Sequence, residues 1–220
     1  MMLRKFAIGL TLLAGIGIMF NLRSSAAEPP SQGQAAPTFT LPSQDGSAVS
    51  LEQFRGKWVL LYFYPKDNTP GCTIEAHNFQ RDLPKYESLN AVVIGVSLDS
   101  EDSHKNFCTK QGLTFKLLSD QEKEVTAKYG SLKNMLGLKM SARNTFLIDP
   151  TGKIAKVWLG VSPASHSAEV LRELQSREGH LSACFDHQKV SVMCLGKLLS
   201  GSVTVRLGTD RAHDNRLRRL

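Results

Sequence analysis

The chain has 220 residues and a net charge of +7, which leaves room for one ordinary domain with extensions. The positive charge belongs to the ends: residues 1–27 carry a net +3 and residues 177–220 a net +4, whereas residues 28–176 hold sixteen charges of each sign. Because nucleic-acid binding needs a basic surface, this balance excludes it for the central region.

The amino terminus has the pattern of an export signal. A short basic region, residues 1–5, precedes fifteen mostly apolar residues, 6–20, and small residues at 25–27 suit cleavage before Glu28. The apolar run is shorter than the roughly 20 residues that span a bilayer. Arg23 is unusual in a cleavage region, however, so an uncleaved membrane anchor through residues 6–20 stays open. Both interpretations place the domain in an extracytoplasmic space such as the periplasm, where disulfides persist.

A polar segment over residues 28–35 is predicted to be a linker to a domain over residues 36–176. Short alternating runs on either side of Gln44, Asp45 and Gly46 predict a β-hairpin. Residues 58–64 are apolar on both faces, and they predict a buried central strand.

Cys72 follows this strand at the start of a predicted helix, in which apolar residues recur with helical spacing over residues 76–83. Unpaired backbone N–H groups and the helix dipole stabilise a thiolate there, and the thiolate is the reactive form of cysteine. The Thr69 hydroxyl is close enough in sequence to lie beside the sulfur. Pro65 has no backbone N–H donor, and its rigid ring can shield the thiolate from water. The alternative is a small buried cysteine that only packs the helix against the sheet.

The rest of the domain alternates strands and helices. Strands are expected at residues 91–97, 115–118, 143–148 and 153–159, and helices at 101–111, 121–129 and 165–175, with a break or kink at Pro84 near the end of the Cys72 helix. This order predicts an α/β fold with helices on both faces of a central sheet.

The segment Tyr62–Ala76 (YFYPKDNTPGCTIEA) resembles the active-site signature of peroxiredoxins, in particular the bacterioferritin comigratory protein or peroxiredoxin Q branch. The likeness runs from about Ala36 to about Gln175 and includes residues 95–99 and 144–149. It implies a thioredoxin-like fold with a central mixed sheet and an N-terminal hairpin. It also implies a thiol peroxidase that reduces hydrogen peroxide and organic hydroperoxides without metal, haem or flavin and is itself reduced by a thioredoxin-like protein; the branch favours a monomer.

The resemblance also assigns site residues. It makes Cys72 the peroxidatic cysteine and places Pro65, Thr69 and Arg143 beside it. A guanidinium there would stabilise the thiolate and present fixed donors to a peroxide oxygen. Glu75, one helical turn after Cys72, matches a family position that braces this arginine.

Cys108 raises a separate question. In much of the branch a resolving cysteine lies five residues after the reactive one, where this chain has His77. Another subset places it in the next helix, in a context like residues 103–112, and this implies a disulfide between Cys72 and Cys108. The alternative is that Cys108 and Phe107 only dock a polar helix, which leaves a one-cysteine peroxidase that uses an external thiol. A disulfide would require both helices to loosen, since its Cα atoms must lie within about 7 Å.

Two other functional classes are disfavoured. An exported thiol–disulfide oxidoreductase would normally carry Cys-x-x-Cys, and Thr69 stands where its first cysteine would be. A non-catalytic binding domain would not need all of the signature residues.

The resemblance stops before residues 177–220, a basic extension of unknown role that is expected to be poorly ordered. The spacing of Cys184, Cys194 and the nearby histidines matches no usual zinc site.

Overall fold

The computed structural model describes residues 28–178. The predictions made for residues 1–27, for a membrane anchor and for the extension from 179 onward lie outside the described residues. Among the helices of the described part, none combines the length and the hydropathy needed to cross a bilayer.

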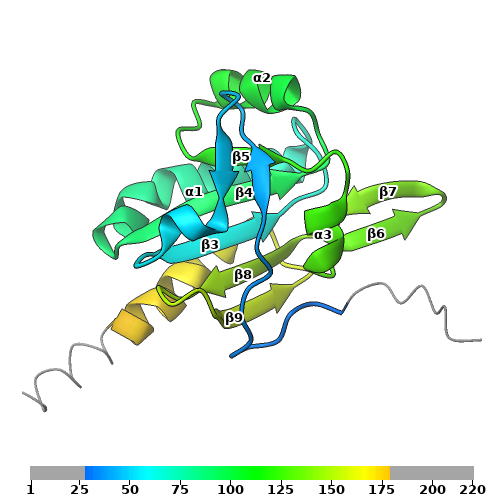
Figure 1. Cartoon of the computed structure of the whole chain (residues 1–220). Coiled ribbons are helices and arrows are strands. Elements are labelled where there is room, and N and C mark those ends of the chain that lie inside the picture. Colours follow the sequence, from blue (N-terminus) through cyan, green and yellow to red (C-terminus); the bar gives the residue numbers. More distant parts are fainter. Residues whose placement is uncertain (1–27, 179–220) are drawn as a thin grey trace, which may run out of the picture. The chain divides into compact units, whose positions relative to one another are not determined.

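A five-stranded mixed sheet forms the centre, in the order β5-β4-β3-β8-β9 (Figure 1). Its strands are β3 (Trp58–Phe63), β4 (Ala91–Ser97), β5 (Lys116–Ser119), β8 (Asn144–Ile148) and β9 (Ile154–Leu159). The first three pair in parallel, and β8 and β9 add antiparallel to the other side of β3. The predicted α/β fold and its mixed sheet are confirmed, and the run 58–64 supplies the central strand because its side chains are buried on both faces.

The predicted N-terminal hairpin is also present. Strand β1 (Thr40–Pro42) pairs antiparallel with β2 (Ala48–Ser50), and the short 3-10 helix η1 (Leu51–Phe54) follows. Gly46 takes a positive φ of 78° in the connecting turn, a conformation that favours glycine. Ahead of this hairpin, residues 33–36 exchange backbone hydrogen bonds with Gly152 and Ile154, so this part of the polar segment lies along the sheet.

Four helices complete the described residues: α1 (Pro70–Ser88), α2 (Glu101–Gln111), α3 (Glu124–Lys128) and a closing helix over residues 166–178. The expected break at Pro84 is wrong, because α1 continues past it to Ser88 while Leu83 and Tyr86 anchor this turn in the core. The helix predicted from Gln121 to Tyr129 is shorter than expected, because Lys123 adopts a left-handed conformation just before it.

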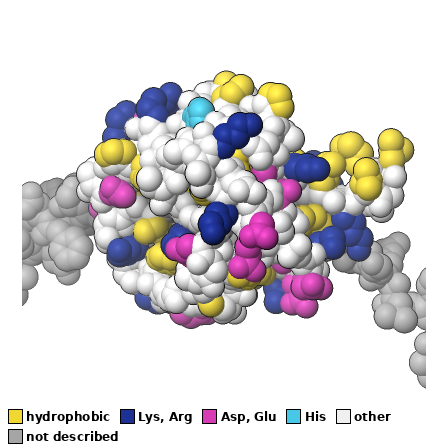
Figure 2. All heavy atoms as spheres, turned by 90° about the horizontal axis from the view of Figure 1, so that it is seen from above, with side chains coloured by type: hydrophobic (Ala, Val, Ile, Leu, Met, Phe, Trp, Pro, Cys, Tyr) yellow, Lys and Arg dark blue, Asp and Glu magenta, His cyan; other side chains and the backbone are white. Residues whose placement is uncertain are grey.

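A second hairpin, β6 (Leu132–Met135) with β7 (Leu138–Ser141), was not predicted from the sequence. Most of its residues are exposed, and apolar and polar residues alternate only over the four positions of β7, the shortest run that indicates a half-buried strand. At its tip Leu136 is fully exposed, and Met135 and Leu138 are more than half exposed. Figure 2 shows these apolar side chains grouped where the hairpin projects from the sheet.

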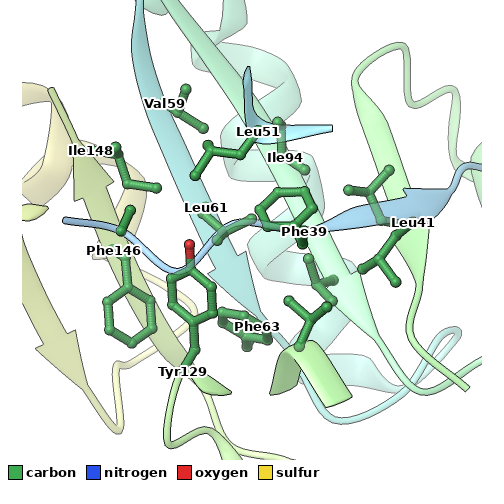
Figure 3. Packing of buried hydrophobic residues seen from close by; sticks show 14 of the residues in the cluster. Phe39, Leu41, Leu51, Val59, Leu61, Phe63, Ile94, Tyr129, Phe146 and Ile148 are labelled. Carbon is green, nitrogen blue, oxygen red and sulfur yellow. The ribbon is translucent and has the colours of Figure 1, made fainter. Parts of the chain in front are cut away.

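Both faces of the sheet are covered. Val59, Leu61 and Phe63 of β3 face a cluster that includes Phe39 and Tyr129, supplied by the segment before β1 and the residue after α3 (Figure 3). The alternate residues face the other way, and the rings of Tyr62 in β3 and Phe79 in α1 lie 4.8 Å apart between centroids. This packing holds the start of α1, and with it Cys72, against the carboxyl end of the central strand.

Candidate active site

Cys72 is the third residue of α1, directly behind the loop that leaves β3. The helix begins well because Thr69 adopts the extended conformation of an N-cap and Pro70 occupies the first turn, where its missing N–H costs nothing. The Cys72 side chain is a free thiol, and the residue is 2% exposed. The unpaired backbone N–H groups and the positive end of the α1 dipole therefore lie beside a buried sulfur.

Arg143 reaches this sulfur from the strand next to β3. It immediately precedes β8, whose Asn144 is paired with Phe63 at the end of β3, so antiparallel pairing brings two distant parts of the chain to one edge. Its Nη2 donates to Cys72 Sγ at 3.1 Å, and its Nη1 donates to Glu75 Oε2 at 2.6 Å. One guanidinium thus spans both groups, as a planar fork of donors allows.

Glu75 is a buried carboxylate that holds this arginine in place. Burial raises the pKa of Glu75 to about 7, although the neighbouring Arg143 charge and hydrogen bond act in the opposite direction. Its Oε1 has no hydrogen-bond partner among the described residues. Burial of this carboxylate with one unpartnered oxygen costs free energy. Its contact with Arg143 fixes the guanidinium beside Cys72.

Gly71 also shapes the site, and the sequence analysis did not single it out. A Cβ at this position would lie 2.8 Å from Arg143 Nη2 and 3.6 Å from Pro163 Cγ. Any larger residue would therefore meet the guanidinium. The sequence carried one signal, a glycine directly before the cysteine in a helical first turn, where glycine is a poor helix former.

The other predicted residues lie nearby, with different contacts. The Thr69 hydroxyl donates to the Lys66 carbonyl at 3.0 Å and so closes the loop. Among the described residues its hydrogen-bond partner is this carbonyl and not the sulfur. Pro65 lies two residues after the end of β3 and is partly buried, and His77 is exposed on α1.

Cys108 lies in α2 as a second free, buried thiol. Burial, followed by the negative charge of Asp67, raises the pKa of Cys108 to about 11. Asp67 belongs to the loop before Cys72, and the sequence analysis missed both it and its partner His104. Burial acts to raise the pKa of Asp67, but hydrogen bonds from His104, Ser103 and Tyr64 hold it below its usual value.

Comparisons with known proteins agree with this geometry. The model of the AhpC/TSA family matches residues 32–157. A putative peroxiredoxin bcp of Coxiella burnetii is 46% identical over 146 residues, which are 64% of this chain and 97% of that protein. A solved mutant of Xylella fastidiosa PrxQ is 36% identical with a TM-score of 0.63, and the match covers 67% of this chain and 99% of that one.

Two mutant structures of Xanthomonas campestris peroxiredoxin Q are also similar. Each is 38% identical with a TM-score of 0.60, and the matches cover 63% of this chain and 90% and 91% of those chains. The two mutants replace cysteines that lie 36 positions apart with serine.

A thioredoxin-like sheet that presents a buried cysteine to an arginine at a helix amino terminus defines the class, and the chain belongs to the AhpC/TSA family. Within that family its relatives are the Bcp and peroxiredoxin Q proteins, at 40–46% identity. It is therefore a peroxiredoxin, an oxidoreductase with thiol peroxidase activity.

Proposed function

We propose that Cys72 is the peroxidatic residue. Its thiolate attacks the terminal oxygen of hydrogen peroxide or an organic hydroperoxide, an S–O bond forms as the O–O bond breaks, and the departing oxygen takes up a proton to leave as water or an alcohol. The hydrogen bond of 3.1 Å from Arg143 Nη2 to Cys72 Sγ is the observation that carries this proposal, since it places a fixed donor where the peroxide oxygens must come.

Glu75 and Thr69 complete the proposed site. Glu75 orients Arg143 through the ion pair between Glu75 Oε2 and Arg143 Nη1. Thr69 and Pro65 shape the loop that leads to the sulfur. With its hydroxyl bonded to Lys66, Thr69 sets the loop conformation in the resting site; a hydrogen bond to a bound peroxide would need this hydroxyl to rotate.

We propose further that Cys108 resolves the sulfenic acid formed on Cys72, and that a thioredoxin-like protein reduces the resulting disulfide. One observation supports this. Cys108 lies 36 positions after Cys72, the separation of the two cysteines substituted in the Xanthomonas campestris mutants.

The second candidate is a one-cysteine peroxidase that uses an external thiol. It is favoured by the burial of Cys108 inside a regular helix and by the raised pKa of its thiol, because such a cysteine is a poor nucleophile as it stands.

The experiment that separates the candidates is non-reducing peptide mass mapping after one equivalent of hydrogen peroxide, on the wild type and on Cys108→Ser. We expect a disulfide between Cys72 and Cys108 in the wild type, and a sulfenic acid or overoxidised Cys72 in the variant. Oxidised Cys72 with Cys108 left free in the wild type would establish the one-cysteine enzyme. An unreacted Cys72 would contradict the peroxidase assignment of this residue.

We also propose that the enzyme acts outside the cytoplasm, on the basis of the export pattern over residues 1–27, and that it is a monomer, as its resemblance to the peroxiredoxin Q branch implies. N-terminal sequencing of the protein from fractionated cells tests this. Cleavage before Glu28 in a soluble extracytoplasmic fraction supports export, an intact terminus in the membrane fraction supports the anchor, and an intact terminus in the cytoplasm contradicts both. Sedimentation of the same sample gives the oligomeric state.

A further inference from the structure

The carboxylate of Asp67 lies at the centre of a buried polar cluster that the proposed chemistry does not use. Tyr64 donates its hydroxyl to Oδ1 at 2.8 Å, and Ser103 donates its hydroxyl to Oδ2 at 2.7 Å. The His104 Nδ1 lies 2.9 Å from the same Oδ2. Asp67 is 4% exposed and His104 is fully buried.

The ring of His104 faces acceptors on both sides. Beyond its contact with Asp67, its Nε2 lies 3.2 Å from the carbonyl oxygen of Leu118 in β5. The two ring nitrogens thus link the Asp67 carboxylate to the backbone of β5. A buried pair of this kind holds its elements firmly, because removing one partner leaves the other charged and buried.

This cluster joins the two segments that carry the cysteines. Asp67 lies in the loop five residues before Cys72, and His104 lies one helical turn before Cys108 on the same buried side of α2. The backbone N–H of Asp67 also donates to Asp99 Oδ2, just before α2 begins, at 2.9 Å. The loop and the first turn of α2 are thus tied together through one residue.

We propose that the Asp67–His104 pair is a latch that sets the rate at which Cys108 reaches oxidised Cys72. Asp67, His104, Ser103 and Tyr64 are then positioning residues for the resolving step, and this inference rests on the proposed role of Cys108. In the latched state α2 is intact and the two cysteines are free thiols. Release of the latch lets the loop and α2 loosen together, which is what the geometry of a disulfide between two helices requires.

The chemistry of resolution explains why release matters. The Cys108 sulfur attacks Cys72 Sγ, an S–S bond forms, the S–O bond of the sulfenic acid breaks, and hydroxide leaves as water with the proton that Cys108 gives up. The latched structure opposes the loss of this proton, because burial and then the Asp67 charge raise the pKa of the thiol. Opening exposes Cys108 and separates it from that carboxylate, so the same movement supplies both approach and deprotonation.

The test is a quenched-flow experiment on the full chain with one equivalent of hydrogen peroxide, which follows Cys72 sulfenic acid and the Cys72–Cys108 disulfide separately by mass spectrometry. Ser103→Ala and Tyr64→Phe each remove one hydrogen bond to Asp67, and His104→Gln removes the imidazole that contacts the same carboxylate. The matched control is Thr109→Ala, which removes an exposed hydroxyl bonded within α2 to Lys105 and leaves Asp67 untouched.

We expect the rate of sulfenic acid formation to stay unchanged in all four variants. Disulfide formation should become about threefold to tenfold faster in Ser103→Ala and Tyr64→Phe, as the loss of one hydrogen bond predicts, and faster still in His104→Gln. At excess peroxide, the fraction of Cys72 overoxidised to sulfinic acid should fall in the same order. Substitution of a residue that only supports the fold would lower the urea midpoint of unfolding but would not change the ratio of disulfide to overoxidised Cys72.

Unchanged or slower disulfide formation in the Ser103 and Tyr64 variants would overturn the latch, as would an equal acceleration in Thr109→Ala. Should His104→Gln fail to fold, the two milder variants carry the test. A wild type that forms no disulfide between the two cysteines would instead remove the proposed role of Cys108, and the latch with it; the two failures are therefore distinguishable.

Discussion

Cys72 and Cys108 are both free, both buried and both helical, yet their surroundings are opposite in charge. Cys72 lies in the first turn of α1, with an arginine nitrogen 3.1 Å from its sulfur. Cys108 lies near the end of α2, where burial and the Asp67 carboxylate raise the pKa of its thiol to about 11. Burial alone therefore does not decide the reactivity of a cysteine; the sign of the nearest charge and the end of the helix do.

The strongest test of this contrast is chemical labelling. At pH 7, a pKa of about 11 leaves roughly one Cys108 in 10⁴ as thiolate, so we expect limited iodoacetamide treatment to modify Cys72 and to leave Cys108 largely unmodified. Peptide mass spectrometry of the native protein measures the ratio, and labelling in denaturant is the control. Equal labelling of the two cysteines in the native protein would break the comparison.

Substitution of Arg143 tests the cation beside Cys72. Arg143→Gln should lower the second-order rate constant for hydrogen peroxide by about 10²–10³-fold, the usual effect of losing a fixed donor at a developing charge. Arg143→Lys keeps the charge but cannot contact both Cys72 and Glu75 through a planar fork, so we expect a loss of about tenfold or more. Stopped-flow measurements give both constants; a lysine variant as fast as the wild type would show that charge alone suffices.

Glu75 should be visible in the pH dependence of stability. Its pKa is raised by burial to about 7 in the folded chain, so between pH 4.5 and 7 the folded state binds a proton that the unfolded state has lost. Stability should therefore fall as pH rises through this window, by about 3 kcal/mol, and Glu75→Gln should lack this fall. Urea unfolding of both proteins at pH 5 and pH 8 measures it.

The same measurement needs the variant as its reference, because His166 acts in the opposite direction. Burial lowers the pKa of His166 to about 4, so this residue adds stability as pH rises from 4 to 6.5 and loses it on acidification. The difference between wild type and Glu75→Gln cancels this term. Parallel profiles for the two proteins would contradict the assignment to Glu75.

The smallest expected effect comes from Gly71→Ala. The new Cβ would lie 2.8 Å from Arg143 Nη2, so the guanidinium must shift and we expect about a tenfold loss in the peroxide rate constant. Alanine favours the helix by up to about 1 kcal/mol over glycine, so the melting temperature should hold or rise. Lower activity together with lower stability would point to general damage instead.

The sequence by itself determined the frame of this protein. The doubly buried run over residues 58–64 identified the central strand, and the helix expected over residues 101–111 ends at Gln111, before Gly112 in a left-handed conformation. Cys72 and its helix start were found in the same way, since these signals are local and arise from burial periodicity and backbone conformation. The resemblance carried by Tyr62–Ala76 then supplied Arg143, Glu75 and Cys108.

Only the tertiary structure decided the long-range contacts. Antiparallel pairing of β8 with β3 brings Arg143 to Cys72, and the close approach at Gly71 exists only because of that pairing. The β6–β7 hairpin was missed because each strand has only four residues and most of its side chains are exposed. Asp67 and His104 look like ordinary polar residues in the sequence, and their role depends on a cluster that forms when a loop and a helix 37 positions apart are buried together. Such contacts follow from chain topology, which no local pattern encodes.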